Sequence, residues 1–153
     1  MSKEISVRLG NTNYACTIND GRHEWLMDEP VESGGNDIAH DPYAALLASL
    51  GSCSAITMKM YAQRKGWPVE DIEIKLSLIT QIVEGKRESV FTRNVFVKGN
   101  LTNEQLLRLE HIATACPVSK ILEGDIIVET TLMPAPDAYA GSISEAKDKP
   151  LQL

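Results

Sequence analysis

The chain has 153 residues, and its 15 Lys and Arg against 21 Asp and Glu give a net charge of −6. That length suffices for one domain whose core needs no disulfide support. The acidic balance, the lack of a basic cluster and an aromatic content of 5% argue against nucleic acid as a partner.

The sequence also argues against secretion and against a membrane partner. The N-terminus, MSKEISVRLG, lacks the apolar core of a signal peptide, and the longest apolar run is broken by Ser52, Ser54, Thr57 and Lys59. We therefore expect a cytoplasmic protein whose three cysteines stay reduced at rest. A bond between Cys53 and Cys116 would then be a transient catalytic species.

The first forty residues predict antiparallel β-structure. Residues 5–9, 14–18 and 23–27 are typical of short strands, and turn-forming residues separate the last two. Cys16 lies in the second of these strands, where a cysteine is simply a small, strand-compatible residue. Residues 28–42 are polar and rich in turn formers, and we expect an exposed loop there.

A long helix is predicted from Asp41 to about Lys65. Asp41 suits the N-cap, and Pro42 suits the first helical position. Gly66, followed shortly by a proline, is a stop signal.

The apolar residues of this helix recur at spacings of three and four, and the stripe contains Leu46, Leu50, Cys53, Thr57 and Met60. Cys53 is therefore expected to point with the buried side. The helix is apolar around most of its circumference, so it needs cover on more than one side.

The next segment predicts a β-hairpin. Residues 72–83 and 91–100 alternate between apolar and polar side chains, and the charged residues 84–89 are expected to form the loop between the two strands. Each strand should therefore have one covered face and one exposed face.

Helices return after the hairpin. Thr102 and Gln105 form a capping box for a helix over residues 101–115. Pro117 cannot continue that helix but suits the start of a new one, so Cys116 should cap the short run 117–122. Residues 125–133 predict a last strand.

This order of elements indicates an α+β fold. Residues 1–133 form a single domain, and the tail, residues 134–153, is expected to be mobile or bound to a partner, because it has little to bury. A single sheet of about six strands covers only one side of the central helix. We therefore predict a dimer that buries the two central helices between two sheets.

The two helical cysteines differ in their expected chemistry. Cys116, at a helix start, lies near free amides and the positive end of the helix dipole, where the thiolate is favoured. Cys53 lies in an apolar stripe, where a free cysteine is often an inert small hydrophobe. From periodicity alone, both an inert and a reactive Cys53 remain open.

The segment DPYAALLASLGSCSAITMKMYAQRKGWPVEDIEI, followed later by ACPVSKIL, resembles the OsmC/Ohr superfamily of osmotically induced and organic hydroperoxide resistance proteins. The resemblance runs from about Ile5 to Met133. It implies an OsmC-like fold, in which antiparallel sheets pack around two long central helices in an intertwined homodimer. It also implies that two active sites lie at the subunit interface.

The resemblance further implies a thiol-dependent peroxidase that reduces organic hydroperoxides to alcohols in oxidative stress defence. By position, Cys53 matches the peroxidatic cysteine, Cys116 the resolving cysteine, and Arg22 the arginine that holds the thiolate. A dithiol such as a lipoyl group would restore both cysteines, with no metal, flavin or other cofactor. The apolar residues Leu50, Ile56, Met60 and Trp25 would suit an alkyl hydroperoxide.

The chain departs from the family pattern at two positions. Tyr43 stands where the family has the glutamate that pairs with the arginine, and a phenol cannot replace a carboxylate in that pair. Asp41 or Glu24 would have to substitute for it. Ser119 stands where many relatives have a histidine.

Other functions follow from other readings of the same residues. A non-catalytic OsmC-like dimer that binds an apolar small molecule at its interface is the main alternative, and Tyr43 favours it. A metal site has little support, because no CxxC, HxxxH or CxxH pair is present. A nucleophilic hydrolase has little support, because GxSxG is absent.

Overall fold

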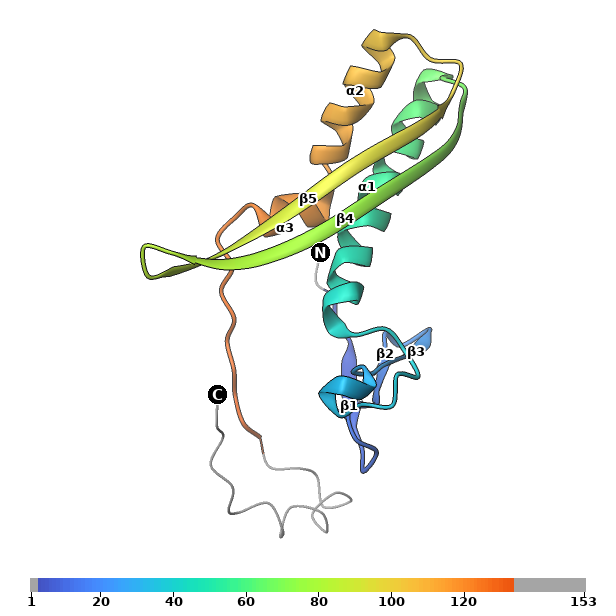
Figure 1. Cartoon of the computed structure of the whole chain (residues 1–153). Coiled ribbons are helices and arrows are strands. Elements are labelled where there is room, and N and C mark those ends of the chain that lie inside the picture. The colour runs from blue at the N-terminus through green and yellow to red at the C-terminus, as the bar shows by residue number, and fades with distance from the viewer. Residues whose placement is uncertain (1–2, 134–153) are drawn as a thin grey trace.

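The computed structural model of the chain describes residues 3–133, so the predicted tail, 134–153, lies outside the described residues. The described part contains antiparallel strands and α-helices, which confirms the α+β class (Figure 1). Its strands form a three-stranded sheet near the N-terminus and a separate two-stranded sheet. The expectation of one sheet of about six strands is therefore wrong for a single chain.

The small sheet consists of β1 (Ser6–Leu9), β2 (Cys16–Asn19) and β3 (Glu24–Met27), paired antiparallel in that order, as predicted. The β2–β3 turn is held by the Asp20 carboxylate, which accepts the backbone N–H groups of Arg22 and His23 at 2.9 and 2.6 Å. Arg22 is exposed at this turn.

The connection to the first long helix differs from the expected exposed loop at one residue. Asp28 is buried, and its carboxylate accepts the backbone N–H groups of Glu29, Asn36 and Ile38 at 2.8, 3.0 and 3.4 Å. Burial raises the pKa of Asp28, but these donors outweigh that effect and bring its pKa below the usual value. The carboxylate thus organises a mostly exposed segment that includes a short 3-10 turn, Val31–Ser33.

Helix α1 (Pro42–Lys65) begins and ends where the sequence predicts. The Asp41 carboxylate accepts the N–H groups of Tyr43 and Ala44 at 2.9 and 3.0 Å. Gly66 ends the helix in the left-handed conformation, with φ of 66°.

The hairpin of β4 (Val69–Val83) and β5 (Lys86–Gly99) is longer than predicted. The expected loop 84–89 is wrong, because Glu84 and Gly85 alone form the turn, with φ of 50° and 77°. Two central residues with positive φ match the twist of the flanking strands, so the ladder continues through residues 86–89. The predicted alternation holds, with half-buried side chains at Ile72, Ile74, Leu76, Leu78, Phe91, Arg93, Val95 and Val97.

The last two helices are α2 (Asn103–Thr114) and α3 (Pro117–Leu122). The predicted capping box is present, since the Thr102 hydroxyl accepts from the Gln105 N–H at 3.2 Å and the Gln105 side chain accepts from the Thr102 N–H at 2.9 Å. Cys116 caps α3 as predicted.

The predicted last strand, residues 125–133, is not formed. The segment runs away from the hairpin without joining either sheet, and its apolar residues Ile126, Ile127, Val128, Leu132 and Met133 are exposed (Figure 1). A strand needs an adjacent edge for its backbone hydrogen bonds, and the described part of the chain places none beside this segment.

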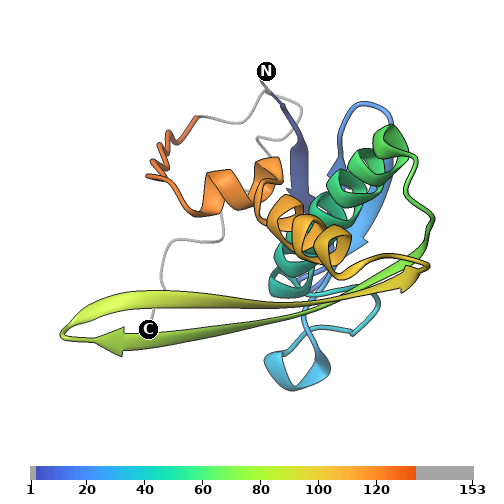
Figure 2. The same cartoon turned by 90° about the horizontal axis from the view of Figure 1, so that it is seen from above.

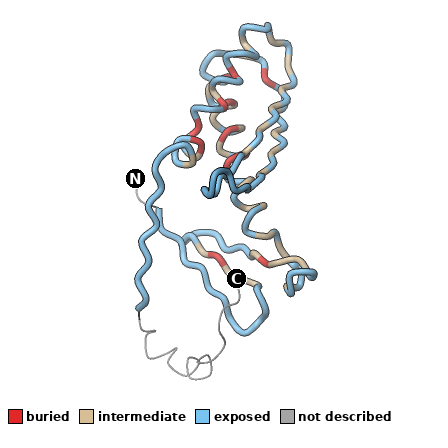
Figure 3. The backbone as a smooth tube through the Cα atoms, turned by 60° about the vertical axis from the view of Figure 1, so that its left-hand side comes forward, coloured by how far each residue is buried: buried red, intermediate tan, exposed pale blue. Residues whose placement is uncertain are grey.

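The core lies between α1, α2 and the hairpin. Its buried members are Met58, Ala62, Val69, Leu109 and Ala113. Helices α1 and α2 cover the same side of the hairpin (Figure 2), and buried residues concentrate where they meet (Figure 3). Gly51 allows α1 to approach β4, because a Cβ atom there would lie 2.8 Å from the Leu76 Cδ1 atom.

The opposite side of α1 has no such cover within the described residues. Ile56 and Met60 are exposed there, each at 59%. Tyr43, in the first turn of α1, is 68% exposed. The other described residues thus cover only part of the apolar surface of α1.

We predict that Leu109→Ala lowers the free energy of unfolding by about 2–5 kcal/mol, because the side chain is fully buried in this core. Leu107→Ala, on the same helix but at a 67% exposed residue, should change it by about 0.5 kcal/mol or less. Chemical denaturation measures both. Equal losses for the two variants would contradict this position of the core.

Candidate functional site

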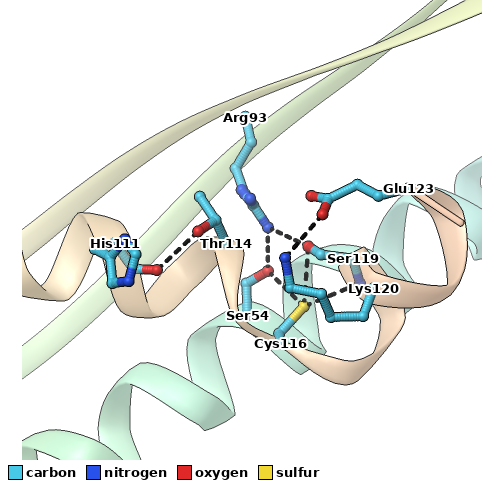
Figure 4. Close-up of polar contacts among 8 residues, drawn as sticks. All are labelled: Ser54, Arg93, His111, Thr114, Cys116, Ser119, Lys120 and Glu123. Atoms are coloured by element: carbon cyan, nitrogen blue, oxygen red, sulfur yellow. Dashed lines mark hydrogen bonds and ion pairs between the residues drawn. The ribbon is translucent and has the colours of Figure 1, made fainter.

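Cys116 lies at the junction of α1, β5 and α3, and its side chain is fully buried, with 0% exposure. The Ser119 backbone N–H donates to Cys116 Sγ at 3.3 Å. The hydroxyl oxygens of Ser119 and Ser54 lie 3.2 and 3.3 Å from the same sulfur (Figure 4). Three hydrogen-bonding groups therefore converge on one thiol.

Arg93 of β5 connects the two serines. Its Nη1 atom donates to Ser54 Oγ at 2.7 Å and to Ser119 Oγ at 2.9 Å (Figure 4). Arg93 is therefore linked to Cys116 by hydrogen bonds through two hydroxyl groups. We refer to Arg93, Ser54, Ser119 and Cys116 as the thiol network.

The sequence interpretation missed Arg93, although a signal was present. In FTRNVFV the side chains alternate between the two faces of the strand, which puts Arg93 on the covered face together with Phe91 and Val95. A cation on a covered face needs a polar partner, so this position could have indicated a buried polar cluster.

Ser54 was also missed as a site residue. It is fully buried, and its hydroxyl donates to the Leu50 carbonyl at 2.8 Å within α1. One step along a helix turns the side chain by about 100° from Cys53, because a turn has 3.6 residues. Ser54 therefore faces Arg93 and Cys116, while Cys53 lies beside them.

Cys53 is half-buried on α1, and the Thr57 hydroxyl donates to its backbone carbonyl at 2.7 Å. Its side chain is among the hydrogen-bonding groups that lower the pKa of the Cys116 thiol. The structure therefore places Cys53 and Cys116 next to each other, which the spacing of 63 positions between them in the sequence could not establish.

The thiol network changes the acidity of Cys116. Burial raises the pKa of Cys116, but the side chains of Ser119 and Ser54, the Ser119 N–H and the Cys53 side chain together outweigh burial and lower this pKa to about 7. This lower pKa favours the thiolate at neutral pH, and the thiolate is the reactive form.

The single chain does not bring Arg22 into this cluster. Arg22 is exposed in the β2–β3 turn, and Glu24 accepts from the Asn19 side chain at 3.4 Å in the same sheet. Asp41 is engaged as the cap of α1, and Tyr43 is exposed. The role of Arg22 stays a prediction.

A cavity of about 330 Å³ opens beside the thiol network. Its apolar lining is Leu50, Val90, Phe91 and Leu122, and its polar lining includes Arg93, Ser119 and Glu123. Of the apolar residues expected near a substrate, Leu50 lines this cavity, whereas Ile56, Met60 and Trp25 are exposed elsewhere. The cavity could receive a small, mainly apolar molecule.

Two other kinds of site find no support in residues 3–133. No group of three or more His, Cys, Asp or Glu side chains is arranged to hold a metal ion there. In the same residues, no helix is long and apolar enough to span a membrane.

Residues 34–131 match the family model of OsmC-like proteins. Among curated proteins, none matches the chain in sequence. Solved structures with the same fold include an OsmC-like protein from Mycoplasma pneumoniae, with a TM-score of 0.69 and 16% identity over 81% of this chain and 89% of that one.

Two further structures bear names that refer to hydroperoxides. The organic hydroperoxide resistance protein OsmC from Legionella pneumophila has a TM-score of 0.61 and 18% identity, over 81% of this chain and 90% of that one. The organic hydroperoxide resistance protein OhrB of Bacillus subtilis has a TM-score of 0.59 and 22% identity, over 82% and 93%.

We predict that Cys116 titrates with a midpoint of about 7 and that Ser119→Ala raises this midpoint, because one hydroxyl donor to the thiolate is lost. The Cβ chemical shift of isotope-labelled cysteine, followed against pH, resolves each thiol in the intact protein. Ser52→Ala, at an exposed serine of α1, is the matched control and should leave the midpoint unchanged. An unchanged midpoint in Ser119→Ala would show that the hydroxyl does not support the thiolate.

Proposed function

The chain belongs to the family of OsmC-like proteins, and we propose that it is a cysteine-based peroxidase that reduces organic hydroperoxides through Cys53 and Cys116. The observation that carries this proposal is the pair of neighbouring thiols, one of them held by hydrogen-bond donors that favour a thiolate. The names of the Legionella and Bacillus structures support the choice of substrate class. Its role would be oxidative stress defence in a reducing cytoplasm.

Exposure supports Cys53 as the peroxidatic cysteine and Cys116 as the resolving cysteine. Cys53 is half-buried and Cys116 is fully buried, so a peroxide meets Cys53 first. The Cys53 thiolate attacks the terminal peroxide oxygen, an S–O bond forms, the O–O bond breaks, and the alkoxide takes a proton and leaves as the alcohol. Cys53 is then a sulfenic acid.

Cys116 completes the oxidative half of the cycle. Its thiolate attacks the Cys53 sulfur, the S–O bond breaks, and the oxygen leaves as water after protonation. The resulting Cys53–Cys116 disulfide returns to two thiols when an external dithiol, such as a lipoyl group, supplies two electrons. The chemistry uses side chains alone and needs no cofactor.

The adjacent cavity favours an organic peroxide over hydrogen peroxide. Leu50, Phe91 and Leu122 offer an apolar surface to an alkyl or aryl group, and that contact contributes free energy only when such a group is present.

We also propose that the protein works as a homodimer. The exposed apolar residues on α1 and in the segment 125–133 need cover that the other described residues do not supply. A second subunit could cover α1 and offer the segment a strand edge. Arg22, in the exposed β2–β3 turn, remains the candidate that would reach a cysteine site across such an interface.

A non-catalytic dimer that binds an apolar small molecule is the second candidate function. It is favoured by Tyr43, which is exposed and cannot act as the carboxylate partner of an arginine. The cavity beside the thiol network would then hold a ligand, and the cysteines would have no turnover.

The peroxidase proposal predicts different losses in two variants. Cys53→Ser should reduce the consumption of cumene hydroperoxide in the presence of a dithiol to the background rate, because the group that attacks oxygen is gone. Cys116→Ser should still form a sulfenic acid at Cys53, which dimedone traps and mass spectrometry detects. Cys16→Ser is the control, since Cys16 lies in β2, and should keep the wild-type rate. Wild-type consumption by Cys53→Ser would exclude the peroxidase and leave the binding function.

The dimer proposal predicts a mass in solution of twice the chain mass of 16.8 kDa. Ile56→Lys should shift the protein toward the monomer, because it places a charge on the exposed apolar side of α1. Sedimentation velocity over a concentration series measures this shift. Gln63→Lys, which adds the same charge at an exposed polar residue of α1, should not produce it. A monomeric wild type would contradict the proposal.

A further inference from the structure

We propose that Arg93 is a positioning residue which, through the hydroxyl groups of Ser54 and Ser119, makes Cys116 the leaving group when the Cys53–Cys116 disulfide is reduced, so that the reductant attacks Cys53. This inference rests on the proposed function, since it concerns the reductive half of the same cycle. It assigns to the thiol network a task beyond forming the disulfide.

The first step of the argument concerns the hydroxyl protons. A guanidinium group only donates, so the oxygen atoms of Ser54 and Ser119 must each turn a lone pair toward Arg93 Nη1. Each hydroxyl proton therefore points elsewhere, and that of Ser54 is donated to the Leu50 carbonyl at 2.8 Å. Cys116 Sγ is the neighbour of both oxygens, at 3.3 and 3.2 Å.

The two protonation states of Cys116 then differ in their hydrogen bonds. As a thiol, Cys116 donates to Ser119 Oγ, which also accepts from Arg93. Once the thiol proton leaves, the Ser119 hydroxyl can turn its own proton to the sulfur and keep its bond from Arg93. The arrangement thus gains a charge-assisted hydrogen bond when the sulfur becomes negative.

Because Cys116 is buried, its thiolate depends on these hydrogen-bond donors for stabilisation. A negative sulfur with 0% exposure would be costly without compensation, because no water reaches it. The Ser119 N–H, the Ser119 hydroxyl and the charge on Arg93 provide that compensation. The Ser54 hydroxyl joins them when its proton turns from the Leu50 carbonyl to the sulfur.

The remaining charged groups around the network are engaged or exposed. At the end of α3, Lys120 Nζ pairs with Oε2 of the C-cap residue Glu123 at 2.9 Å (Figure 4). On α2, His111 is exposed, and its backbone carbonyl accepts from the Thr114 hydroxyl at 2.8 Å. On α1, the titratable neighbour is Cys53, which becomes part of the disulfide.

The difference between the two cysteines determines which sulfur of the disulfide a reductant attacks. When a thiolate attacks one sulfur of a disulfide, the other sulfur leaves with the bonding electron pair, and it leaves faster when its thiolate is more stable. The network stabilises that charge on Cys116. Cys53 is also the more accessible sulfur, so stability and access select the same point of attack.

The electron balance is complete with a dithiol as reductant. Its first thiolate bonds to Cys53 Sγ, the Cys53–Cys116 bond breaks, and Cys116 keeps the electron pair as a thiolate. The second thiolate of the dithiol then attacks the first dithiol sulfur and releases Cys53. The dithiol loses two electrons and becomes a disulfide, and both cysteines are reduced.

Arg93→Met tests the role of the guanidinium, because methionine keeps an apolar side chain on the covered face of β5 and removes the donors. Reduction of the oxidised protein by dithiothreitol should be about tenfold slower, because Cys116 becomes a poorer leaving group. In the reduced variant, the Cys116 titration should move from about 7 toward the ordinary thiol value of about 8.5. Arg93→Lys should recover part of both changes, which loss of packing alone would not explain.

Arg87→Met is the matched control, at an exposed arginine of the same strand near the hairpin turn, and should leave both readings unchanged. Equal reduction rates and equal Cys116 titrations in wild type and Arg93→Met would overturn the inference.

A separate experiment identifies the sulfur that the reductant attacks. Oxidised protein treated briefly with excess glutathione and quenched with N-ethylmaleimide should carry glutathione on Cys53 and the maleimide on Cys116, as seen by peptide mass mapping. Glutathione on Cys116 would overturn the inference.

The disulfide can be prepared with diamide instead of peroxide. If organic peroxide leaves both thiols unmodified, the proposed function fails, whereas the diamide-oxidised protein still tests the leaving group. The two failures are therefore distinguishable.

Discussion

The site depends on the two hydrogen bonds that Arg93 donates from β5 to Ser54 of α1 and Ser119 of α3. These bonds join three elements that are far apart in the sequence around one buried sulfur. Hydrophobic packing of α1 against β4 and α2 brings the elements together, but it does not orient polar side chains. The guanidinium group provides this orientation, because it only donates, in a fixed geometry, and so each serine oxygen must point a lone pair toward it.

The second consequence of this arrangement is an asymmetry between the two thiols. Cys116 is buried among donors, whereas Cys53 is half-buried at the edge of the same network. Access to solvent and stabilisation of negative charge, which many reactive cysteines combine at one sulfur, are divided here between two neighbouring sulfurs. A division of this kind suits a cycle in which one thiol meets external molecules and the other forms and releases the internal bond.

Three features of the described residues lack a structural partner, and all three bear on the proposed function. The N-terminal sheet carries Arg22 away from the cysteines, one side of α1 is apolar and exposed, and no strand among residues 3–133 lies beside the segment 125–133. The second subunit that we propose would supply a partner for all three features, so dimerisation and the activation of Cys53 would be linked. The thiol network, by contrast, is complete within the described part of one chain.

Features that depend only on residues close together in the chain could be predicted without the structure. The caps at Asp41, Thr102 and Cys116, the stop at Gly66 and the alternation along the hairpin are local, because each depends on hydrogen bonds or side-chain directions within a few residues. Other features depend on how distant segments pack: Asp28 is buried, the hairpin loop is short, Cys53 lies beside Cys116, and no strand edge within residues 3–133 reaches residues 125–133. Arg93 bonds to serines that are 39 and 26 positions away, and only the packing of the helices on the hairpin determines such distances.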